Sequence, residues 1–414
     1  MTAPALAAGP RHAEPPAARL VWRVTDDHGP LGALVIDDVV AHRACGGLRI
    51  AAAVTDEELR ELATVMTLKF AFFGIACGGA KAGFVVPETA SAAERRRRAR
   101  TFGAALGPLL RAGSYIPGTD LGCGQRDLWE VLDGAGVPVG TPPTGPVETS
   151  GTAGFSGRSA AIAALAALGG RARDATLAVL GYGRVGAALA ARFTAAGGRL
   201  VGIATARAAA VRPDGFDPAR LERLRGLHGD DLPLHYPGAR PVERDVLLGL
   251  GVDVLSPCAT AGMIDAERAR RVRCRILCAG ANAAVTADAE PVLEANGTTV
   301  LPDFVTNAGG VLVSHFWPLA LSERAVDTLL ERRFRAVVDD LLRRAAAAGT
   351  TPATLARGLA GRNLARLRRA PANAVRHERL FTRLGRGRLR HVLPSVVVNT
   401  LVLRVARDLG PPTE

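Results

Sequence analysis

The hydrophobic and polar positions of this chain follow two different periods. Short apolar runs at residues 20–24 and 33–36 predict β-strands that end at Cys45-Gly46-Gly47-Leu48-Arg49. From Thr55, whose Thr-x-x-Glu spacing predicts a helix N-cap, apolar residues recur every three or four positions as far as Phe73. The chain therefore starts with strands that lead into an amphipathic helix.

A change of pattern near residue 145 predicts a domain boundary. Before it we expect a strand at 84–86 and helices at about 91–110 and 125–132. Residues 137–146 are rich in Pro and Gly, which is typical of a linker. The predicted organisation is as follows: a disordered tail over 1–18, a first domain over 19–145, a second over 146–320, and C-terminal helices over 321–414 that pack back on the first domain.

Beyond the linker, strands alternate with helices, which predicts a parallel sheet. The expected strands lie at 176–180, 200–204, 252–255, 275–278 and 299–301. Helices are expected at about 157–168, 184–196, 322–348 and 352–369, with a further apolar helix or packed segment over 394–409.

Composition narrows the class of protein. The 414 residues are 48% hydrophobic, and no run of eighteen apolar residues predicts a membrane span. The formal charge of +13 raises the possibility of nucleic-acid binding. However, the arginines are spread along the chain and aromatic residues make up only 4%, so we favour solvated basic surfaces and expect no nucleic-acid partner.

The six cysteines do not fall at metal-ligand spacing. None forms a Cys-x-x-Cys pair and no His/Cys cluster accompanies them, so we expect no metal site. Free thiols fit a reducing compartment, and the N-terminus has no signal-peptide pattern. We therefore expect a cytoplasmic protein.

Lysine occurs at only two positions, Lys69 and Lys81, and every other cationic Lys or Arg position is arginine. Lys69 falls on the apolar stripe of the predicted helix, and Lys81 follows a Gly-Gly pair where the backbone can turn or approach a ligand closely. A buried lysine can lose its charge, whereas arginine cannot. Chance survival of two lysines is the alternative, but their proximity favours an acid–base or anion-binding function.

A dinucleotide site is predicted by Gly181-Tyr182-Gly183-Arg184-Val185-Gly186, which directly follows an apolar strand and opens a helix. The expected acidic residue after the second strand is absent, and Thr205 and Arg207 stand there instead. These residues, with Arg212 as a further candidate, favour NADP over NAD.

These pieces together resemble the glutamate/leucine/phenylalanine/valine dehydrogenase family. The matching motifs occur in the family's order over about residues 30–320. They are Gly46-Gly47-Leu48-Arg49, Met66-Thr67-Leu68-Lys69, Gly78-Gly79-Ala80-Lys81-Ala82-Gly83, Asp120-Leu121-Gly122, the glycine motif at 181–186, Pro213-Asp214-Gly215, Gly280-Ala281-Asn282, Pro302-Asp303 and Asn307-Ala308-Gly309-Gly310-Val311.

The resemblance implies an activity: reversible oxidative deamination of an L-amino acid to a 2-oxo acid and ammonia with NAD(P). It implies that Lys81, with a depressed pKa, activates water, and that Asp120 moves a proton to and from the substrate nitrogen. Lys69 is expected to bind the α-carboxylate.

The resemblance also implies which residues surround the substrate and the coenzyme. The substrate-binding set is Lys69, Cys45, Gly46, Gly47, Val311 and Ser314. The coenzyme-binding set is Thr152, Gly181, Gly183, Arg184, Val185, Gly186, Thr205, Arg207, Asn282 and Asn307.

The fold that the resemblance implies is α/β, with two domains and a cleft between them. An N-terminal mixed-sheet substrate and oligomerisation domain would face a Rossmann dinucleotide-binding domain. A homo-oligomer is expected.

The side-chain pocket departs from the glutamate-specific members. They carry a lysine where this chain has Cys45, so a second carboxylate would lose its main partner. Ser314, in contrast, matches the other side-chain contact of the glutamate enzymes. We therefore expect a glutamate-dehydrogenase-like enzyme with an altered pocket. The alternative is a non-catalytic relative that binds a nucleotide or metabolite, and the joint presence of Lys69, Lys81 and Asp120 argues against it.

Overall fold

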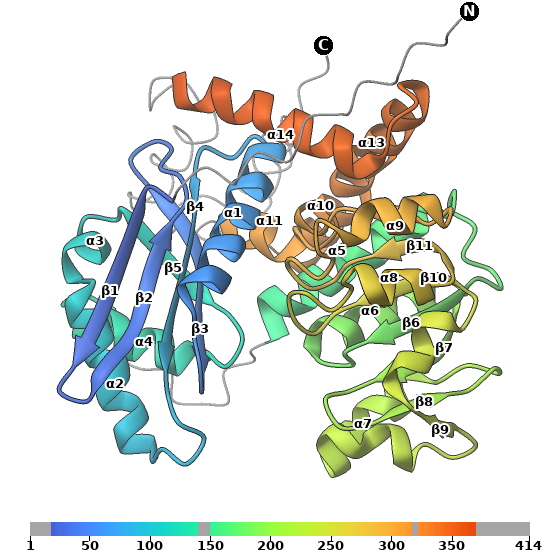
Figure 1. Cartoon of the computed structure of the whole chain (residues 1–414), viewed down its shortest axis with the longest axis horizontal. Coiled ribbons are helices and arrows are strands. Elements are labelled where there is room, and N and C mark those ends of the chain that lie inside the picture. Colours follow the sequence, from blue (N-terminus) through green and yellow to red (C-terminus); the bar gives the residue numbers. More distant parts are fainter. Residues whose placement is uncertain (1–17, 140–149, 317–321, 370–414) are drawn as a thin grey trace, which may run out of the picture.

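The structure, a computed structural model, describes residues 18–139, 150–316 and 322–369. Two sheets, each with its own helices, lie side by side, and helices from the end of the described chain lie above both (Figure 1). The predicted two-domain α/β fold is confirmed. The expected boundary near 145 and the segment 394–409 lie outside the described residues.

In the described chain the first sheet has five strands in the order β1-β2-β4-β3-β5. β2 pairs antiparallel with both β1 and β4, whereas β3 is parallel to both β4 and β5, so the sheet is mixed as expected. The strands are β1 (Leu20–Asp26), β2 (Gly29–Ile36), β3 (Ala44–Ala51), β4 (Gly78–Val85) and β5 (Tyr115–Thr119).

Two strands are longer than the sequence indicated. The motif at 45–49 lies inside β3 rather than at a strand end, and Lys81 lies inside β4 rather than after a turn. The glycines before Lys81 serve close packing instead, because a Cβ on Gly79 would lie 2.2 Å from the backbone nitrogen of Thr67. The prediction of a turn there was wrong, and the close approach that the structure shows is to a helix; a close approach to a ligand stays a prediction.

The helices of the first body are α1 (Asp56–Phe72), α2 (Ala92–Ala105), α3 (Gly107–Arg111) and α4 (Gln125–Gly134). Thr55 caps α1 by accepting a hydrogen bond from the Glu58 backbone N–H, as the sequence predicted. The single helix expected over 91–110 is interrupted at Leu106, because Pro108 has no N–H to continue it and starts α3 instead.

In the second body, the described strands follow the order β12-β11-β10-β6-β7-β8-β9, parallel from β12 to β7. The sequence analysis missed β8 and β9, which are three-residue antiparallel additions at one edge. The strands are β6 (Thr176–Leu180), β7 (Arg199–Ala204), β8 (Ala209–Val211), β9 (Arg240–Val242), β10 (Val252–Pro257), β11 (Cys274–Cys278) and β12 (Thr299–Leu301).

Helices surround this second sheet. They are α5 (Ser150–Ala167), α6 (Arg184–Ala195), α7 (Pro218–His228), α8 (Ala266–Arg271), α9 (Ala289–Ala295), α10 (Asp303–Thr306) and α11 (Gly309–Phe316), with short 3₁₀ turns η1 (Gly229–His235) and η2 (Arg244–Gly249). Within the described ranges, no helix is both long enough and apolar enough to cross a membrane.

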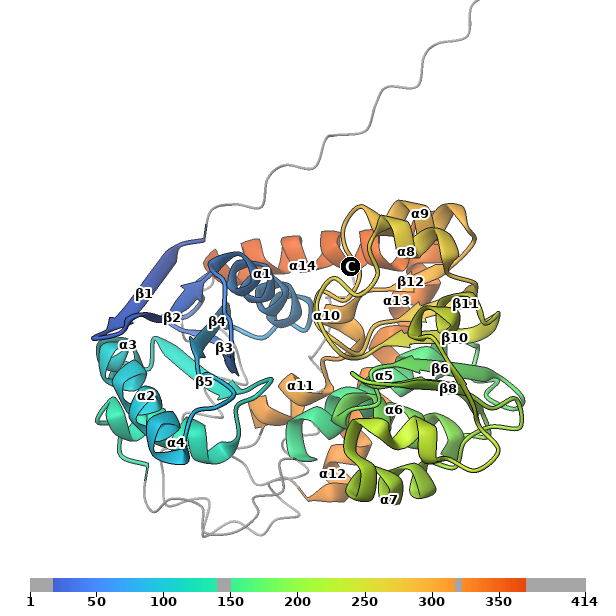
Figure 2. The same ribbon diagram turned by 60° about the horizontal axis from the view of Figure 1, so that its bottom comes forward.

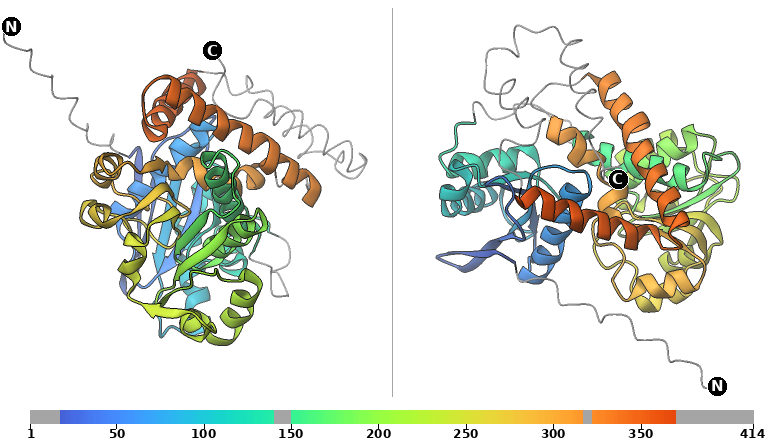
Figure 3. Two further views of the ribbon diagram at one scale, coloured as in Figure 1. Left: turned by 90° about the vertical axis from the view of Figure 1, so that its right-hand side faces the viewer. Right: turned by 90° about the horizontal axis from the view of Figure 1, so that it is seen from above.

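The last described helices connect the two bodies. They are α12 (Glu323–Thr328), the π-helical turn η4 (Leu329–Phe334), α13 (Arg335–Ala347) and α14 (Pro352–Arg369). The π-turn lies inside the stretch that the sequence predicted as one uniform helix. α14 contacts both α1 and β12, and Figures 2 and 3 show it crossing from the second body to the first.

Aromatic rings fill the seam between the two bodies. Phe72, at the end of α1, packs edge-on against Phe304 of α10 with ring centroids 6.1 Å apart. Phe73 stacks on Phe334 of the π-turn, also at 6.1 Å. These rings belong to the hydrophobic cluster that includes both α1 and the second sheet, so α1 is packed from both sides.

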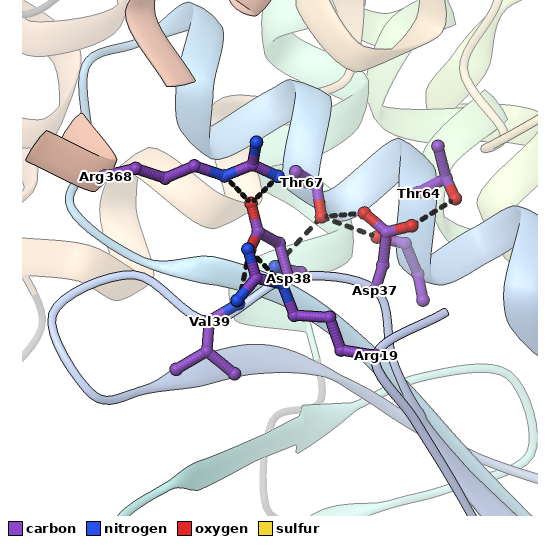
Figure 4. A network of polar contacts seen from close by, with 9 residues as sticks. Arg19, Asp37, Asp38, Val39, Thr64, Thr67 and Arg368 are labelled. Carbon is purple, nitrogen blue, oxygen red and sulfur yellow. Dashed lines mark hydrogen bonds and ion pairs between the residues drawn. The ribbon is translucent and has the colours of Figure 1, made fainter. Parts of the chain in front are cut away.

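A buried carboxylate fixes the far end of α14. Asp38, whose side chain is 1% exposed, accepts hydrogen bonds from Arg368 Nη2 at 2.6 Å and from Arg19 Nε at 2.8 Å (Figure 4). The Val39 backbone N–H donates to the same carboxylate. The end of the β2 strand is thereby joined to the last described helix.

We expect Arg368→Ala to lower the free energy of unfolding by about 1 kcal/mol, because one charged hydrogen-bond donor is lost while Arg19 still neutralises Asp38. Urea unfolding measures the effect. Arg366→Ala is the matched control, since Arg366 is an exposed arginine on the same helix. Equal midpoints for the two variants would show that the Arg368–Asp38 pair does not hold α14.

Candidate functional site

The carboxylate of Asp120 lies at the centre of a cluster of charges. Its Oδ2 atom is 2.8 Å from Lys81 Nζ and 3.1 Å from Arg49 Nε. Lys81 is 2% exposed and Arg49 is 9% exposed, so both cations are removed from water. Arg49 also pairs with Glu58 of α1. The sheet brings these groups together from β3, β4 and the loop after β5.

Two glycines of the first sheet leave room for this cluster. A Cβ on Gly47 would lie 2.9 Å from Asp120 Cβ and 3.2 Å from Lys81 Nζ. A Cβ on Gly46 would lie 1.6 Å from the carbonyl oxygen of Ala80. Any side chain at either position would displace the strand or the lysine. The glycine pair is therefore needed for the close approach of β3 to its neighbours.

The charges around Asp120 keep it ionised. Burial raises the pKa of its carboxyl, but the positive charges and hydrogen bonds of Lys81 and Arg49 outweigh burial and lower the pKa to about 2. At neutral pH the resting site therefore holds a carboxylate between two cations.

Lys69 lies on α1, in the same body as this cluster, and contacts the second body across the seam. Its Nζ donates to Asn307 Oδ1 at 2.6 Å and to Asn282 Oδ1 at 3.0 Å. Asn307 in turn donates through Nδ2 to Asn282 Oδ1 and to the carbonyl of Gly280. The structure thus brings together three residues that the sequence analysis placed in two different binding sets.

The ammonium of Lys69 has no carboxylate within hydrogen-bond distance among the described residues. Its side chain is buried, at 3% exposure, and burial lowers its pKa to about 8, a fall that the more distant charge of Asp303 reduces. The carboxylate oxygens of Asp303 accept hydrogen bonds from the backbone N–H groups of Ala283 and Phe304. Lys69 is therefore a buried cation with neutral acceptors only.

A polar network positions the helix that carries Lys69. Thr67 Oγ1 accepts a hydrogen bond from the Gly79 backbone N–H at 3.1 Å and donates to the carboxylate of Asp37 at 2.5 Å. Thr64 donates to the other oxygen of Asp37 (Figure 4). Thr67 precedes Lys69 by two residues and Gly79 precedes Lys81 by two. This contact therefore sets the separation of the two lysines.

The glycine loop after β6 has the geometry of a dinucleotide cradle. Gly181 has φ +109°, and a Cβ on Gly186 would lie 2.3 Å from the Gly181 carbonyl oxygen, so the turn needs both glycines. A Cβ on Gly183 would meet nothing within 4 Å. Gly183 precedes α6 and gives it no side-chain cap, which leaves the helix N-terminus open to a pyrophosphate. The loop fits a dinucleotide.

Arg184 is exposed at the first position of α6 and Val185 is half-buried beside it. β6 lies where the strand order changes direction, between β10 and β7. This is the position at which open parallel sheets bind nucleotides.

The residues after β7 are used in different ways. Thr205 is buried, and its hydroxyl donates to the Asp230 and Ala208 carbonyls, so it shapes the chain. Arg207 is 70% exposed and pairs with Asp231 at 3.1 Å. Arg212 lies over the Tyr236 ring and donates to the Pro237 carbonyl. Of the three residues considered for a 2′-phosphate, Arg207 is the one left on the surface.

The expected side-chain pocket is apolar at one end. Cys45 is half-buried and packs against the core cluster that contains Met66 and Cys77, and the two thiols share a hydrogen bond. Val311 also packs against this cluster. Ser314 is exposed, and no described contact joins it to either lysine. The side chain of Thr152 lies outside the described residues.

Comparison with known proteins gives the family. The sequence model described as "Glutamate/Leucine/Phenylalanine/Valine dehydrogenase" matches residues 145–371. That described as "Glu/Leu/Phe/Val dehydrogenase, dimerisation domain" matches residues 26–134. The chain belongs to the glutamate/leucine/phenylalanine/valine dehydrogenase family. It is an oxidoreductase that acts on CH–NH₂ donors with NAD or NADP.

Individual members of the family are similar along most of the chain. Glutamate dehydrogenase of Thermotoga maritima is 31% identical over 76% of this chain and 82% of the relative. NADP-specific glutamate dehydrogenase A1 of Halobacterium salinarum is 33% identical, covering 66% and 68%. The crystal structure of hetero-hexameric glutamate dehydrogenase from Thermus thermophilus, in a Leu-bound form, has a TM-score of 0.72 at 31% identity and covers 85% of this chain and 88% of that one.

Two residues of the charge cluster, Arg49 and Glu58, had no predicted role in the site. Arg49 and Gly47 stand two positions apart on β3, so their side-chain directions share one face of the sheet with Lys81 of β4. That alternation was a signal for Arg49. Glu58 was interpreted only as part of a helix cap, and nothing in its local sequence indicates that its carboxylate pairs with Arg49.

The low pKa of Lys69 leads to a pH dependence. About nine in ten Lys69 side chains carry the charge at pH 7, and this fraction falls as the pH rises through 8. We expect the KM for the 2-oxo acid, which does not titrate in this range, to rise about tenfold per pH unit above pH 8. Steady-state kinetics in the amination direction at saturating ammonia measures this.

Lys69→Arg is the control, because arginine keeps its charge at these pH values. Its KM for the 2-oxo acid should be higher than that of the parent at pH 7 but independent of pH up to 9.5. A parent KM that is also flat over this range would contradict a role for the Lys69 charge in binding the acid.

Proposed function

We propose that this enzyme catalyses the reversible oxidative deamination of an L-amino acid with an apolar or small side chain, giving the 2-oxo acid and ammonia. The observation that carries the proposal is the pair of buried lysines beside Asp120, one balanced by a carboxylate and the other not. An α-amino acid supplies both a carboxylate and a nitrogen that gains and loses protons.

Lys69 is assigned to the α-carboxylate of the substrate. A buried ammonium that faces only amide oxygens is stabilised by an incoming anion, because burial without a counter-charge is costly. Asn282 and Asn307 already hold Lys69 Nζ in place, so little ordering remains for the moment of binding. Their position on the second body allows the substrate to join the two bodies.

Lys81 and Asp120 are assigned to the proton transfers. With its charge removed, the Lys81 amine takes a proton from the water that attacks the imine carbon. Asp120 receives a proton from the substrate nitrogen and returns one to the departing ammonia. The two groups are 2.8 Å apart, so each can adjust to the charge of the other. The buried site excludes other water from the imine.

The glycine loop would hold the coenzyme, which would supply the hydride acceptor for the substrate Cα and, in the reverse direction, the hydride donor. Gly181, Gly183 and Gly186, with Arg184 and Val185, would hold its pyrophosphate. We assign NADP as the preferred form, because no carboxylate ends β7 and Arg207 is exposed there. Its surface ion pair with Asp231 is weak enough to yield to a 2′-phosphate.

The apolar surroundings of Cys45 set the choice of side chain. A thiol offers no positive charge to a second carboxylate, and Met66 and Cys77 lie in the same cluster. Arg43 is engaged with the carbonyl oxygen of Ala76. A distal carboxylate would therefore lose its water without gaining a cation, which disfavours glutamate.

The protein is proposed to be a homo-oligomer. The match of residues 26–134 is to the dimerisation domain of the family, and the similar Thermus thermophilus enzyme is hetero-hexameric. Light scattering in solution tests this proposal, and a monomeric mass would overturn it.

A panel of amino acids assayed by nicotinamide reduction, with NAD and NADP in parallel, tests the proposed reaction. We expect turnover with an apolar or small amino acid and a higher kcat/KM with NADP.

Lys81→Ala should abolish turnover while coenzyme binding, followed by fluorescence, stays within about twofold, because Lys81 lies in the first body. Glutamate turnover far above that of every apolar amino acid would refute the proposed specificity, and an active Lys81→Ala variant would refute the mechanism.

Cys45→Lys tests the side-chain assignment directly. A lysine at this position would place a cation where the pocket now has a thiol, so we expect kcat/KM for glutamate to rise at least tenfold and that for the apolar substrate to fall. Cys45→Ser is the control, since it adds polarity without charge and should favour neither. If Cys45→Lys leaves the ratio of the two substrates unchanged, Cys45 does not line the pocket.

A further inference from the structure

In the resting structure, the contacts of Asp120 oppose the proton transfer that the proposed function assigns to it. One oxygen, Oδ2, carries both Lys81 at 2.8 Å and Arg49 at 3.1 Å. A carboxylate held by two cations accepts a proton poorly near neutral pH. Proton transfer is most efficient when the pKa of the transferring group lies near the working pH. At least one of the two cations must therefore loosen its hold during the reaction.

The two cations can do this in different ways. A lysine can release its proton and become neutral, whereas an arginine keeps its charge and can only move. Arg49 has somewhere to move. Its Nη1 already pairs with Glu58 on α1, while its Nε contacts Asp120, so the guanidinium is shared between two carboxylates.

The carboxylate of Glu58 pairs with Arg49 and not with the start of its own helix. In a capping box its carboxylate would bond back to the Thr55 backbone N–H. In this structure Thr55 accepts from the Glu58 N–H, but the Glu58 carboxylate pairs with Arg49. The Glu58 side chain is 33% exposed and the Arg49 side chain is 11% exposed. Glu58 thus reaches from the edge of the site to the buried cation.

Other titratable groups lie around Asp120, but none of them places a permanent charge on its carboxylate as Arg49 does. The charged or titratable neighbours from all packed elements are Lys81, Arg49, Glu58, Lys69, Tyr115 and Cys123. Burial raises the pKa of both Tyr115 and Cys123, so these two stay neutral at working pH. Lys69 faces the asparagines. The charge next to Asp120 that cannot be lost by deprotonation is therefore that of Arg49, whose other partner is Glu58.

We propose that Arg49 and Glu58 act as a positioning pair that controls when Asp120 accepts a proton, with Glu58 drawing the guanidinium away as the substrate nitrogen gives up its proton. This inference rests on the proposed function, in which Asp120 is the proton carrier. Arg49 touches only Asp120 and Glu58 among these groups, so it acts through Asp120 rather than on the substrate.

The proposal gives opposite signs for two substitutions. The acid limb of the kcat profile reports protonation of the group that has to accept the proton, which the proposed function assigns to Asp120. Arg49→Gln removes a positive charge, which favours the protonated forms and should move the acid limb up by about 1–3 pH units. Glu58→Gln removes a negative charge and should move the limb down by about half a unit. The double variant should fall between them.

The test is the pH profile of kcat for the parent, Arg49→Gln, Glu58→Gln and the double variant. Arg49→Lys keeps the charge and should restore the limb to within a few tenths of a unit of the parent. Arg343→Gln and Asp340→Asn, which change an exposed pair on α13 by the same charges, are the matched controls and should not move the limb. A merely structural role for Arg49 and Glu58 would lower kcat without opposite shifts.

A second measurement is independent of turnover. The infrared band of the Asp120 carboxyl, identified by its loss in Asp120→Asn, should titrate at higher pH in Arg49→Gln and at lower pH in Glu58→Gln. If the limb and the band stay in place in an active enzyme, or shift in the same direction in Arg49→Gln and in Glu58→Gln, the inference is overturned and the proposed function stands. A band that shifts as expected in a protein with no turnover on any amino acid refutes the proposed function and retains the positioning pair.

Discussion

Two positive charges that folding removes from water organise this structure, and they are balanced in different ways. Lys81 faces the carboxylate of Asp120, so its charge has a partner within the protein. Among the described residues, Lys69 donates to the amide oxygens of Asn282 and Asn307 and to no carboxylate, and burial lowers its pKa to about 8. The first site is electrically complete, whereas the second becomes complete only when an anion arrives. In the proposed function, the substrate carboxylate is the anion that offsets the cost of burying Lys69.

The framework that holds the two lysines also couples the two bodies. Gly79 lets β4 touch α1 at Thr67, and that contact fixes how far apart Lys69 and Lys81 lie. The same helix ends in Phe72, which packs on Phe304 of the second body. A movement of one body against the other would therefore change the contacts of Lys69, whose partners are in the second body, more than those of Lys81. The partner of Lys81 is in the same body as Lys81 itself.

The sequence was sufficient for features that depend on local pattern and insufficient for those that depend on pairing. The stripe of α1, the glycine loop after β6 and the alternation of strands and helices were predicted, because each is visible in neighbouring residues. Arg49 was quoted in a motif without a role, since its contact with Asp120 spans 71 positions. Thr205 was predicted to favour a 2′-phosphate, yet its hydroxyl is hydrogen-bonded to the carbonyls of Ala208 and Asp230.

The division between lysine and arginine inside the site follows from the space and the partners around each cation. A Cβ on Gly47 would already lie 3.2 Å from Lys81 Nζ, so the strand there has no room for the planar fork of an arginine. At Lys69, two amide oxygens converge on one nitrogen, which suits an ammonium. Arg49 bridges two separate carboxylates, which needs the fork, and its charge is permanent. A chain that uses arginine almost everywhere therefore keeps lysine at the two buried positions where the cation has to be compact.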